Sequence, residues 1–527
     1  MPKITITEAD LTRTNVAEDV SNVVYIPGFS TAKVNMAAQF DDFVPTSGEN
    51  AVNGMPPMMP KLCKTLAEFY TFFGQDAPKF VEQLSYPVQT AASDDGPFVE
   101  GFASIAVKGL EGTNMFEKGE VDPSYIMATE LLRAGIPVLY ERVNYLGSEI
   151  VKAGEGVPTA ATVGTIGDVY IDITETEEPE ANAYICTAVK DGKYTWVAYG
   201  DKHFEVEGTT VKTTAPDIDG LTMYAFLSNA FKNSTTNPNA LYDLNEYDIS
   251  YITTGGYPVF EYDDNAIVED MFDIATIRGD ATALIDHVNN PTRTLVGDDS
   301  VFGSVNGEDY GISNDHAAMY TPWYLATTSS GNRYMPGSFA YLISLAEAIL
   351  TSPNWLAVAG VARGVVPGAK RLNTIQKLTN SIADSYVNSK DSGKVCINPI
   401  TNIKNFGLTI WGNRTLSATS INTEKALYFA NMRIMINEVK KACYRASQRL
   451  MFEQNSDILW TNFKARITPL LDRMSTSNAL AGYSITRIPS DSKTEVKAEI
   501  KLRPIYPVEE FTIAVVLTNE DVNVEEE

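Results

Sequence analysis

The sequence predicts an α/β protein, with mixed layers of helices and strands, that is divided into several domains. At 527 residues the chain is too long for a single hydrophobic core. In two segments, 122–143 and 265–286, a helical pattern leads directly into a short apolar strand, which is typical of layered α/β folds. Residues 151–212 interrupt this alternation with strand patterns alone.

The first elements are short. Residues 3–7 alternate apolar and polar side chains, as an exposed strand does, and a first core strand is expected within 22–30. Apolar residues at helical spacing in 65–74 predict a helix that ends at Gly74.

Segment 122–143 carries the signals of a complete helix followed by a strand. Asp122 is placed as the N-cap, and Pro123 occupies the first helical position, where its missing N–H is not needed. Gly135 ends the helix, and the apolar run after it predicts a buried strand.

The pattern of residues 151–212 predicts a small all-β module, with turn residues between short alternating strands. The segment contains eleven acidic and five basic residues, a net charge of −6. We expect it to be inserted on the surface, between the strand at 137–143 and a helix near 217–231. Its pattern resembles small β modules that decorate phage structural proteins.

The longest helical pattern covers residues 424–450 and has an apolar stripe on one side. It contains six basic and two acidic residues, a net of +4 in a chain whose formal charge is −26. A second helix is expected at 457–474, followed by strands at 498–503 and 511–517. The basic residues on the other side of the first helix are Arg433, Lys440, Lys441, Arg445 and Arg449.

Composition excludes several classes of function. A charge of −26 argues against a nucleic-acid binder, which needs a basic face to neutralise phosphates. The four cysteines are scattered, so neither a zinc site nor a disulfide framework is expected. There is no secretory signal at the first residues and no apolar run of about 18 residues that would span a membrane. We therefore expect a soluble protein made in a cytoplasm.

No motif for catalysis or cofactor binding is present. The sequence lacks a phosphate-binding loop, a dinucleotide-binding glycine motif and a nucleophile elbow. Its three histidines are isolated, and its paired aspartates lie in loops without the spacing of a calcium site. The prediction is a protein that is not an enzyme, with no catalytic residue, no cofactor and no metal.

The stretch "GLTIWGNRTL" (407–416) admits three interpretations: a ligand site, a turn or an anchor for a neighbouring subunit. We favour a structural role. Trp411 is expected to pack at the end of a core strand, and Gly412 to permit the turn. Arg414 is expected to hydrogen-bond carbonyls or carboxylates that hold the start of the 424–450 helix.

Residues 315–527 contain, in order, the motifs Tyr-x-Pro-Trp, Asn-Pro-Ile, Trp-Gly-x-Arg-Thr-Leu, Phe-Glu-x-Asn, Gly-Tyr and Tyr-Pro-x-Glu-x-Phe. This ordered series resembles the C-terminal half of contractile phage tail sheath proteins. Fainter echoes occur in "EFYTFFG", "TELLRAGIPVLYERV" and "YDISYITTGGYPVF", so the resemblance covers most of the chain outside 151–212. The residues that carry it are Tyr320, Pro322 and Trp323; Asn398 to Ile400; Trp411, Gly412, Arg414, Thr415 and Leu416; Phe452, Glu453 and Asn455; Gly482 and Tyr483; and Tyr506, Pro507, Glu509 and Phe511.

The resemblance implies a structural subunit that polymerises helically around a tail tube and contracts to drive the tube through a host envelope. The implied partners are other copies in stacked rings, the tail tube protein, and the baseplate and tail terminator proteins, with no nucleic acid and no membrane insertion. The implied location is the virion, after assembly in the host cytoplasm. A non-contractile virion decoration protein and a virion-associated glycan-cleaving enzyme are the alternatives.

The resemblance to tail sheath proteins implies roles for two surfaces. The basic side of the 424–450 helix is expected to face the tube, and the terminal strands are expected to pair with neighbouring subunits. The arm residues are Ile4, Thr5, Ile6, Phe511, Ile513, Val515 and Leu517. The expected domains are an N-terminal arm (1–22), an outer α/β domain in two parts (23–150 and 213–345) around the β module (151–212), a sheath core (346–510), and a C-terminal strand arm with an acidic tail (511–527).

Overall fold

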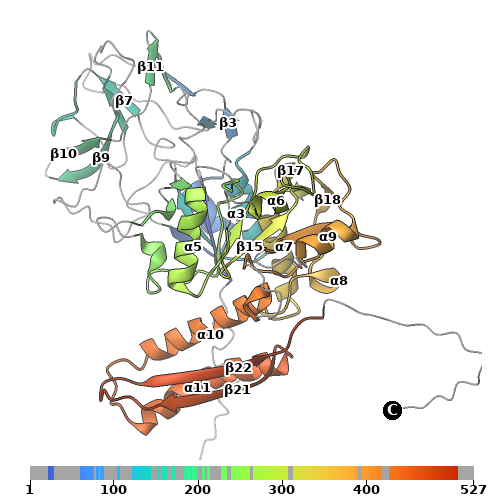
Figure 1. Cartoon of the computed structure of the whole chain (residues 1–527). Helices are drawn as coiled ribbons and strands as arrows, with labels where there is room; N and C mark the ends of the chain where they lie inside the picture. Colours follow the sequence, from blue (N-terminus) through green and yellow to red (C-terminus); the bar gives the residue numbers. More distant parts are fainter. Residues whose placement is uncertain are drawn as a thin grey trace, which may run out of the picture. The chain divides into compact units, whose positions relative to one another are not determined.

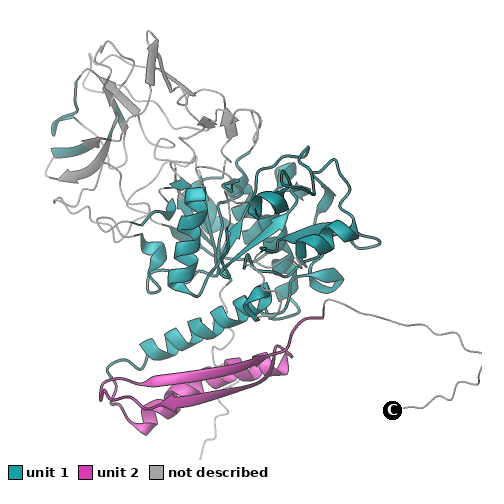
Figure 2. Ribbon diagram, viewed as in Figure 1, with its two compact units in different colours: residues 1–452 teal, residues 453–527 magenta. Residues whose placement is uncertain are grey.

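The computed structural model describes two compact units, residues 1–452 and 453–527 (Figure 2). The expected arm strands at 3–7 and 511–517 lie outside the described residues. The described residues are 22–28, 60–75, 77, 79–81, 84–87, 104–106, 121–143, 151–154, 156–162, 169–172, 183–190, 193–198, 204–207, 210–213, 227–228, 230–233, 239–260, 265–306, 312–387, 394–417 and 426–508.

An eight-stranded sheet forms the centre of the first unit (Figure 1). Its inner strands run parallel, and the edge strands β2 and β20 run antiparallel to their neighbours. This confirms the predicted α/β class. In spatial order the strands are β2 (Lys61–Cys63), β6 (Val138–Arg142), β1 (Val24–Gly28), β13 (Tyr251–Ile252), β14 (Thr282–Ile285), β15 (Ala317–Thr321), β19 (Asn398–Ile403) and β20 (Gly407–Ile410).

Helices cover both faces of this sheet. Side chains alternate between the faces along each strand, so each face has apolar side chains that helices cover. Val24 and Ile26 pack in one core cluster, and Val23 and Tyr25 pack in the other. The first cluster includes α2 (Leu66–Phe73), α3 (Pro123–Arg133) and α7 (Gly337–Ile349), and the second includes α5 (Ala266–Arg278), α6 (Val301–Val305) and α9 (Asn380–Val387).

The predicted boundaries of α2 and α3 are confirmed, and caps account for the ends of three helices. The Thr65 side chain accepts from the Glu68 N–H while the Glu68 carboxylate accepts from the Thr65 N–H, a complete capping box for α2. Asp122 caps α3 through the Ser124 N–H, with Pro123 at the first position. Helix α5 ends at Gly279, which adopts a left-handed conformation with φ 68°.

A second, three-stranded sheet packs on the same face as α3 and α7. It consists of β17 (Gly331–Met335), β16 (Tyr324–Thr328) and β18 (Ala369–Leu372), in that order. Tyr324, Ala326 and Met335 turn inward and join that core cluster. The short helix α8 (Gly360–Arg363) lies in the connection before β18.

Most described residues of 151–212 form strands, as the sequence predicts, and 156–162 form a turn-containing connection. Strands β7 (Val151–Gly154), β8 (Val169–Asp172), β9 (Ala183–Lys190) and β10 (Lys193–Ala198) make one sheet. The hairpin of β11 (Phe204–Glu207) and β12 (Thr210–Thr213) pairs with β4 (Leu84–Pro87), which lies outside the expected module. Strands β3 (Lys79–Val81) and β5 (Ser104–Ala106) pair with each other.

The C-terminal part differs from the expected division. The boundary expected at 345/346 does not separate compact units, because β19 continues the sheet that contains β15, and the division falls after residue 452. The long helix α10 (Ala430–Gln448) follows the 3-10 turn η4 (Ala426–Tyr428) and belongs to the first unit. Another 3-10 turn, η2 (Ala240–Tyr242), precedes β13.

The second unit contains α11 (Asp457–Thr476) and an antiparallel pair of β21 (Leu480–Ile488) and β22 (Lys497–Pro504). The strand expected at 498–503 is β22, which pairs with β21. Among the residues described here, no helix combines the length and apolarity that crossing a bilayer requires.

Candidate functional site

The carboxyl ends of parallel strands are the usual ligand position of an α/β sheet, at the point where strand order reverses. In this sheet that point lies between β1 and β13. The Asp122 carboxylate there accepts from the hydroxyls of Ser124 at 2.6 Å and Tyr257 at 2.5 Å. A Cβ added to Gly28 would lie 2.1 Å from the Tyr140 hydroxyl oxygen. Buried side chains thus fill the position.

A small cavity lies at the carboxyl ends of β14 and β15, and its polar lining is internally bonded. Thr321 Oγ1 is 2.7 Å from His287 Nε2, and the Trp323 indole N–H donates to the His287 carbonyl at 2.8 Å. The Asn373 amide donates to Asn289 Oδ1 at 2.6 Å. No group of three His, Cys, Asp or Glu side chains suited to a metal ion occurs among the described residues.

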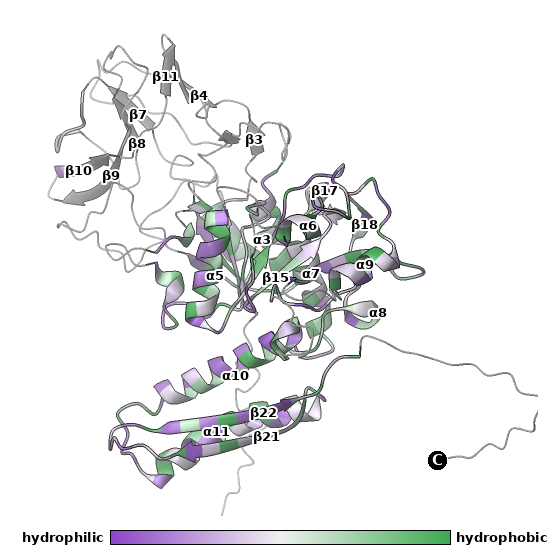
Figure 3. Cartoon of the chain, in the orientation of Figure 1, coloured by the Kyte–Doolittle hydropathy of each residue, from purple (hydrophilic) through white to green (hydrophobic). Residues whose placement is uncertain are grey.

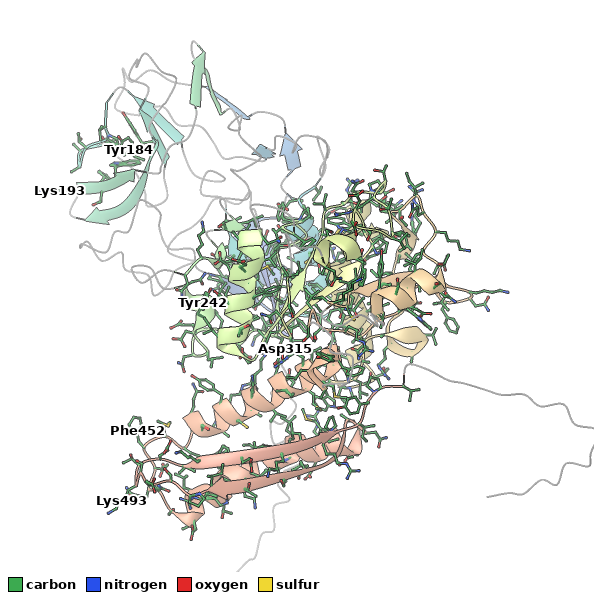
Figure 4. All side chains as sticks on the ribbon, viewed as in Figure 1. Tyr184, Lys193, Tyr242, Asp315, Phe452 and Lys493 are labelled. Carbon is green, nitrogen blue, oxygen red and sulfur yellow. The ribbon has the colours of Figure 1, made fainter. Side chains whose placement is uncertain are left out.

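Helix α10 packs across the opposite, amino-terminal ends of the strands. The Lys441 ammonium donates to Ser250 Oγ at 2.7 Å and lies 3.2 Å from the Asp248 carboxylate, just before β13. The Arg433 guanidinium pairs with Asp315, just before β15. Figure 4 labels Asp315 between the sheet and the helix. Basic residues of α10 therefore bind acidic loops of their own unit.

Uncharged and acidic residues of α10 extend this contact to β1 and β14. The Asn437 amide donates to Thr282 Oγ1 at 3.1 Å. The Asn354 amide donates both to Glu438 Oε1 at 3.1 Å and to Asn22 Oδ1 at 2.8 Å. Burial raises the pKa of Glu438, and this is opposed mainly by the nearby Lys441 ammonium. One helix thus contacts the starts of β13, β14 and β15, and Asn354 links it to the start of β1.

The five basic residues expected to face a tube are divided by the fold. The side chains of Arg433 and Lys441 are only 4% and 3% exposed, so the expected cationic surface does not include them. Burial lowers the pKa of Arg433, and pairing with a carboxylate opposes that effect. Arg445 is partly exposed and pairs with Asp248, whereas Lys440 and Arg449 are exposed. Figure 3 shows hydrophilic and hydrophobic residues mixed along α10.

The turn after β20 is held by hydrogen bonds within its own unit, and Trp411 differs from its expected place in the core. Trp411 is 42% exposed and is not packed in the core. Gly412 is required because a Cβ there would lie 2.7 Å from Asn398 Oδ1. That oxygen accepts from the Arg414 N–H at 2.6 Å, and the Asn398 amide donates to the Arg414 carbonyl at 2.8 Å. The Arg414 guanidinium lies 4.3 Å from the Phe429 ring centroid, just before α10.

Two buried carboxyls have pKa values raised toward neutrality. Burial raises the pKa of Glu141 to about 8, although the Tyr25 hydroxyl donates to it at 2.6 Å and lowers the pKa. Burial likewise raises the pKa of Asp286 to about 7, opposed by hydrogen bonds from the Ser338 hydroxyl and N–H. Both residues lie at the carboxyl ends of sheet strands, so the core carries ionisable groups that titrate near neutral pH.

The second unit exposes basic residues on its helix. Lys464, Arg466 and Arg473 of α11 are exposed, while Ile467 and Leu471 are buried beneath the helix. Its two-stranded sheet leaves the outer edges of β21 and β22 without a partner strand in the part of the chain that is described.

No protein-family profile matches the chain. The tail sheath protein of Vibrio phage KVP40 is 25% identical over 200 residues, which cover 36% of this chain and 27% of that protein. This confirms the resemblance to tail sheath proteins. The chain thus spans about a quarter of the length of the curated relative it matches.

Several solved structures are similar to the chain. The contracted helical sheath of the anti-feeding prophage is 13% identical, covers 95% of this chain and 93% of its own, and has a TM-score of 0.46. The sheath tail protein of Desulfitobacterium hafniense is 9% identical over 92% of this chain and 97% of its own, with a TM-score of 0.42. The contracted PVC sheath complex is 21% identical over 57% and 81%, with a TM-score of 0.39.

The Arg433 ion pair predicts a large difference between two arginines of one helix. Arg433→Met leaves Asp315 without its partner and should lower the free energy of unfolding by about 3 kcal/mol, the low end for a buried pair because water reaches Asp315. The exposed Arg449→Met is the control and should change it by less than about 0.5 kcal/mol. Urea unfolding followed by circular dichroism measures both. Equal effects would contradict the assigned role.

Glu141 predicts a pH dependence of stability. Its pKa in the folded state, about 8, exceeds the ordinary value of 4.5, so the folded protein retains a proton that the unfolded chain releases. The stabilisation is complete below about pH 4.5 and is lost as pH rises through about 8. Glu141→Gln should therefore raise the unfolding midpoint relative to the unmodified protein at pH 9, but not at pH 5. A difference that is constant with pH, as expected for the exposed Glu453→Gln, would refute this assignment.

Proposed function

We propose that this protein is the structural subunit of a contractile tail sheath, which polymerises around a tail tube and contracts to drive it through a host envelope. The observation that carries the proposal is the match to a curated tail sheath protein, which agrees with the ordered motifs of residues 315–527. A sheet whose ligand position is filled by Tyr140, Tyr257 and Asp122 supports a scaffold role over catalysis.

The proposed assembly is a homo-oligomer of stacked rings that contacts the tail tube, baseplate and terminator proteins. Its location would be the virion, after assembly in the host cytoplasm. The outer edges of β21 and β22 support strand addition, because an unpaired edge offers backbone N–H and C=O groups to another chain. Residues 3–7 and 511–517 remain the proposed arms that pair with such edges in neighbouring copies.

We place the proposed tube contact mainly on α11, whereas the sequence predicts it on α10. Arg433 and Lys441 are occupied inside their own unit, which leaves Lys440 and Arg449 as the exposed cations of α10. Helix α11 exposes three cations, Lys464, Arg466 and Arg473, of which Lys464 and Arg466 are two residues apart. A regular array of such helices would present repeated positive charge to an acidic tube.

Assembly of the purified protein tests the function directly. In negative-stain microscopy the intact chain should form long hollow cylinders, whereas a chain lacking residues 1–12 should remain soluble, folded and unpolymerised. Its thermal unfolding should be unchanged, because the removed strand is proposed to pair outside its own subunit. Monodisperse monomers of the intact chain would refute the sheath role. Cylinders of the truncated chain would refute the arm alone.

Replacing Lys464, Arg466 and Arg473 with Gln should weaken attachment to the tube protein. Each exposed pair is worth about 0.2–1 kcal/mol, so three losses should reduce affinity per subunit about tenfold. Co-sedimentation with tube protein at low and high salt measures this. A matched control replaces the exposed Lys493, Lys497 and Lys501 of the same unit with Gln. Equal loss in both variants would show that only net charge matters, contrary to this contact.

A further inference from the structure

The three-stranded sheet β17–β16–β18 lies in a basic stretch of the first unit. Residues 316–383 contain five basic residues and one acidic residue, within a chain of formal charge −26. Three of the basic residues, Arg333, Lys370 and Arg371, lie on these strands, which contain no Asp or Glu. The sheet therefore has a local charge opposite to that of the protein.

The outer face of this sheet holds its cations in fixed positions. Leu325 is in register with both Tyr334 and Arg371, so these three side chains lie on one face. The Arg371 guanidinium donates to the Tyr334 hydroxyl at 2.7 Å, and the Lys370 ammonium donates to Asn332 Oδ1 at 2.7 Å. Neither cation forms an ion pair with any described residue. The face is ordered, exposed and open to a carboxylate.

Helix α5 presents the complementary charge. Glu269 and Asp273 are exposed one turn apart, and Asp270 lies beside them. Burial raises the pKa of Asp270; Lys232 opposes this, and the two neighbouring carboxylates add to it. No described residue forms an ion pair with the three carboxylates. The same exposed side carries Ile277, which is 64% exposed.

The two surfaces cannot meet within one copy. Strands β16 and β17 pack through Tyr324 and Met335 on the sheet face that also carries α3 and α7, whereas α5 packs through Met271 and Ile274 on the opposite face. Figure 1 shows α5 and the β17–β18 strands on opposite sides of β15. A contact between them must join different copies. Because two different surfaces meet, the contact is heterologous, the kind that builds rings or helical polymers.

We propose that the outer face of β17–β16–β18 in one copy docks on the α5 surface of a second copy. The contact would place Lys370 and Arg371 against Glu269 and Asp273, with Leu325 and Tyr334 near Ile277. It rests on the proposed sheath function, since it names a surface through which copies join. It is independent of the terminal arms and of the tube contact.

Charge reversal on either surface tests the contact. Lys370→Glu with Arg371→Glu, and separately Glu269→Lys with Asp273→Lys, should each raise the critical concentration for cylinder assembly at least tenfold. The thermal unfolding midpoint should stay unchanged, because all four side chains are exposed or half-buried. The milder Lys370→Gln with Arg371→Gln should give a smaller rise in the same direction, which keeps the test informative if the reversed sheet folds poorly.

Mixing the two reversed variants is the decisive measurement. The first variant keeps an acidic α5 and the second keeps a basic sheet, and the two reversed surfaces also attract each other. An equimolar mixture should therefore assemble within about twofold of the unmodified critical concentration. The exposed Lys193→Glu with Lys404→Glu has the same change in net charge as the first variant and should assemble normally.

Other outcomes overturn the contact in distinguishable ways. Normal assembly of both reversed variants would refute it while leaving the sheath function intact. Impaired variants that are not rescued by mixing would show that the two surfaces do not face each other. If the Lys370/Arg371 variant forms normal cylinders but loses DNA that the unmodified cylinders retain, the sheet is a nucleic-acid surface and not the proposed contact. An unmodified chain that forms no polymer would refute the sheath function and this contact together.

Discussion

The first unit depends on the pairing of basic residues of α10 with acidic loops that precede the strands. Lys441 binds Asp248 ahead of β13, and Arg433 binds Asp315 ahead of β15. These strands are parallel, so their starts lie at one edge of the sheet, and α10 crosses that edge. Because both cations are buried, replacing their partners with water is costly. A helix near the end of the unit thus holds together loops from its middle.

The sequence predicts local structure well because local structure depends on nearby residues. Asp122 starts α3 through a contact two residues away, and Gly74 ends α2 through its own backbone N–H. The sequence also shows the positive charge of α10. It does not show that Arg433 and Lys441 are buried, because nothing in their spacing reveals that loops more than a hundred residues away supply carboxylates. An acidic residue directly before a predicted strand is the signal that could have suggested it.

The turn at 411–416 also shows that sequence patterns do not reveal contacts between distant residues. An aromatic residue after a core strand predicts burial, yet Trp411 is largely outside the core, while Asn398 holds the turn through two hydrogen bonds to the Arg414 backbone. Asparagine in a strand pattern gives no sign of that role. The pairing of β12 with β4 was missed for a similar reason, since strand partners distant in sequence leave no periodic signal.

The opposite charges of the β17–β16–β18 sheet and helix α5 have a consequence for any polymer joined through these two surfaces. A chain of head-to-tail subunits has no internal symmetry that exchanges its ends, so the two ends are chemically different. One terminal subunit leaves Lys370 and Arg371 uncovered, and the other leaves the carboxylates of α5 uncovered. Proteins that stop or start such a polymer can therefore recognise the correct end by the sign of its charge. In a polymer joined by the proposed contact, directionality would be encoded in each subunit before assembly begins.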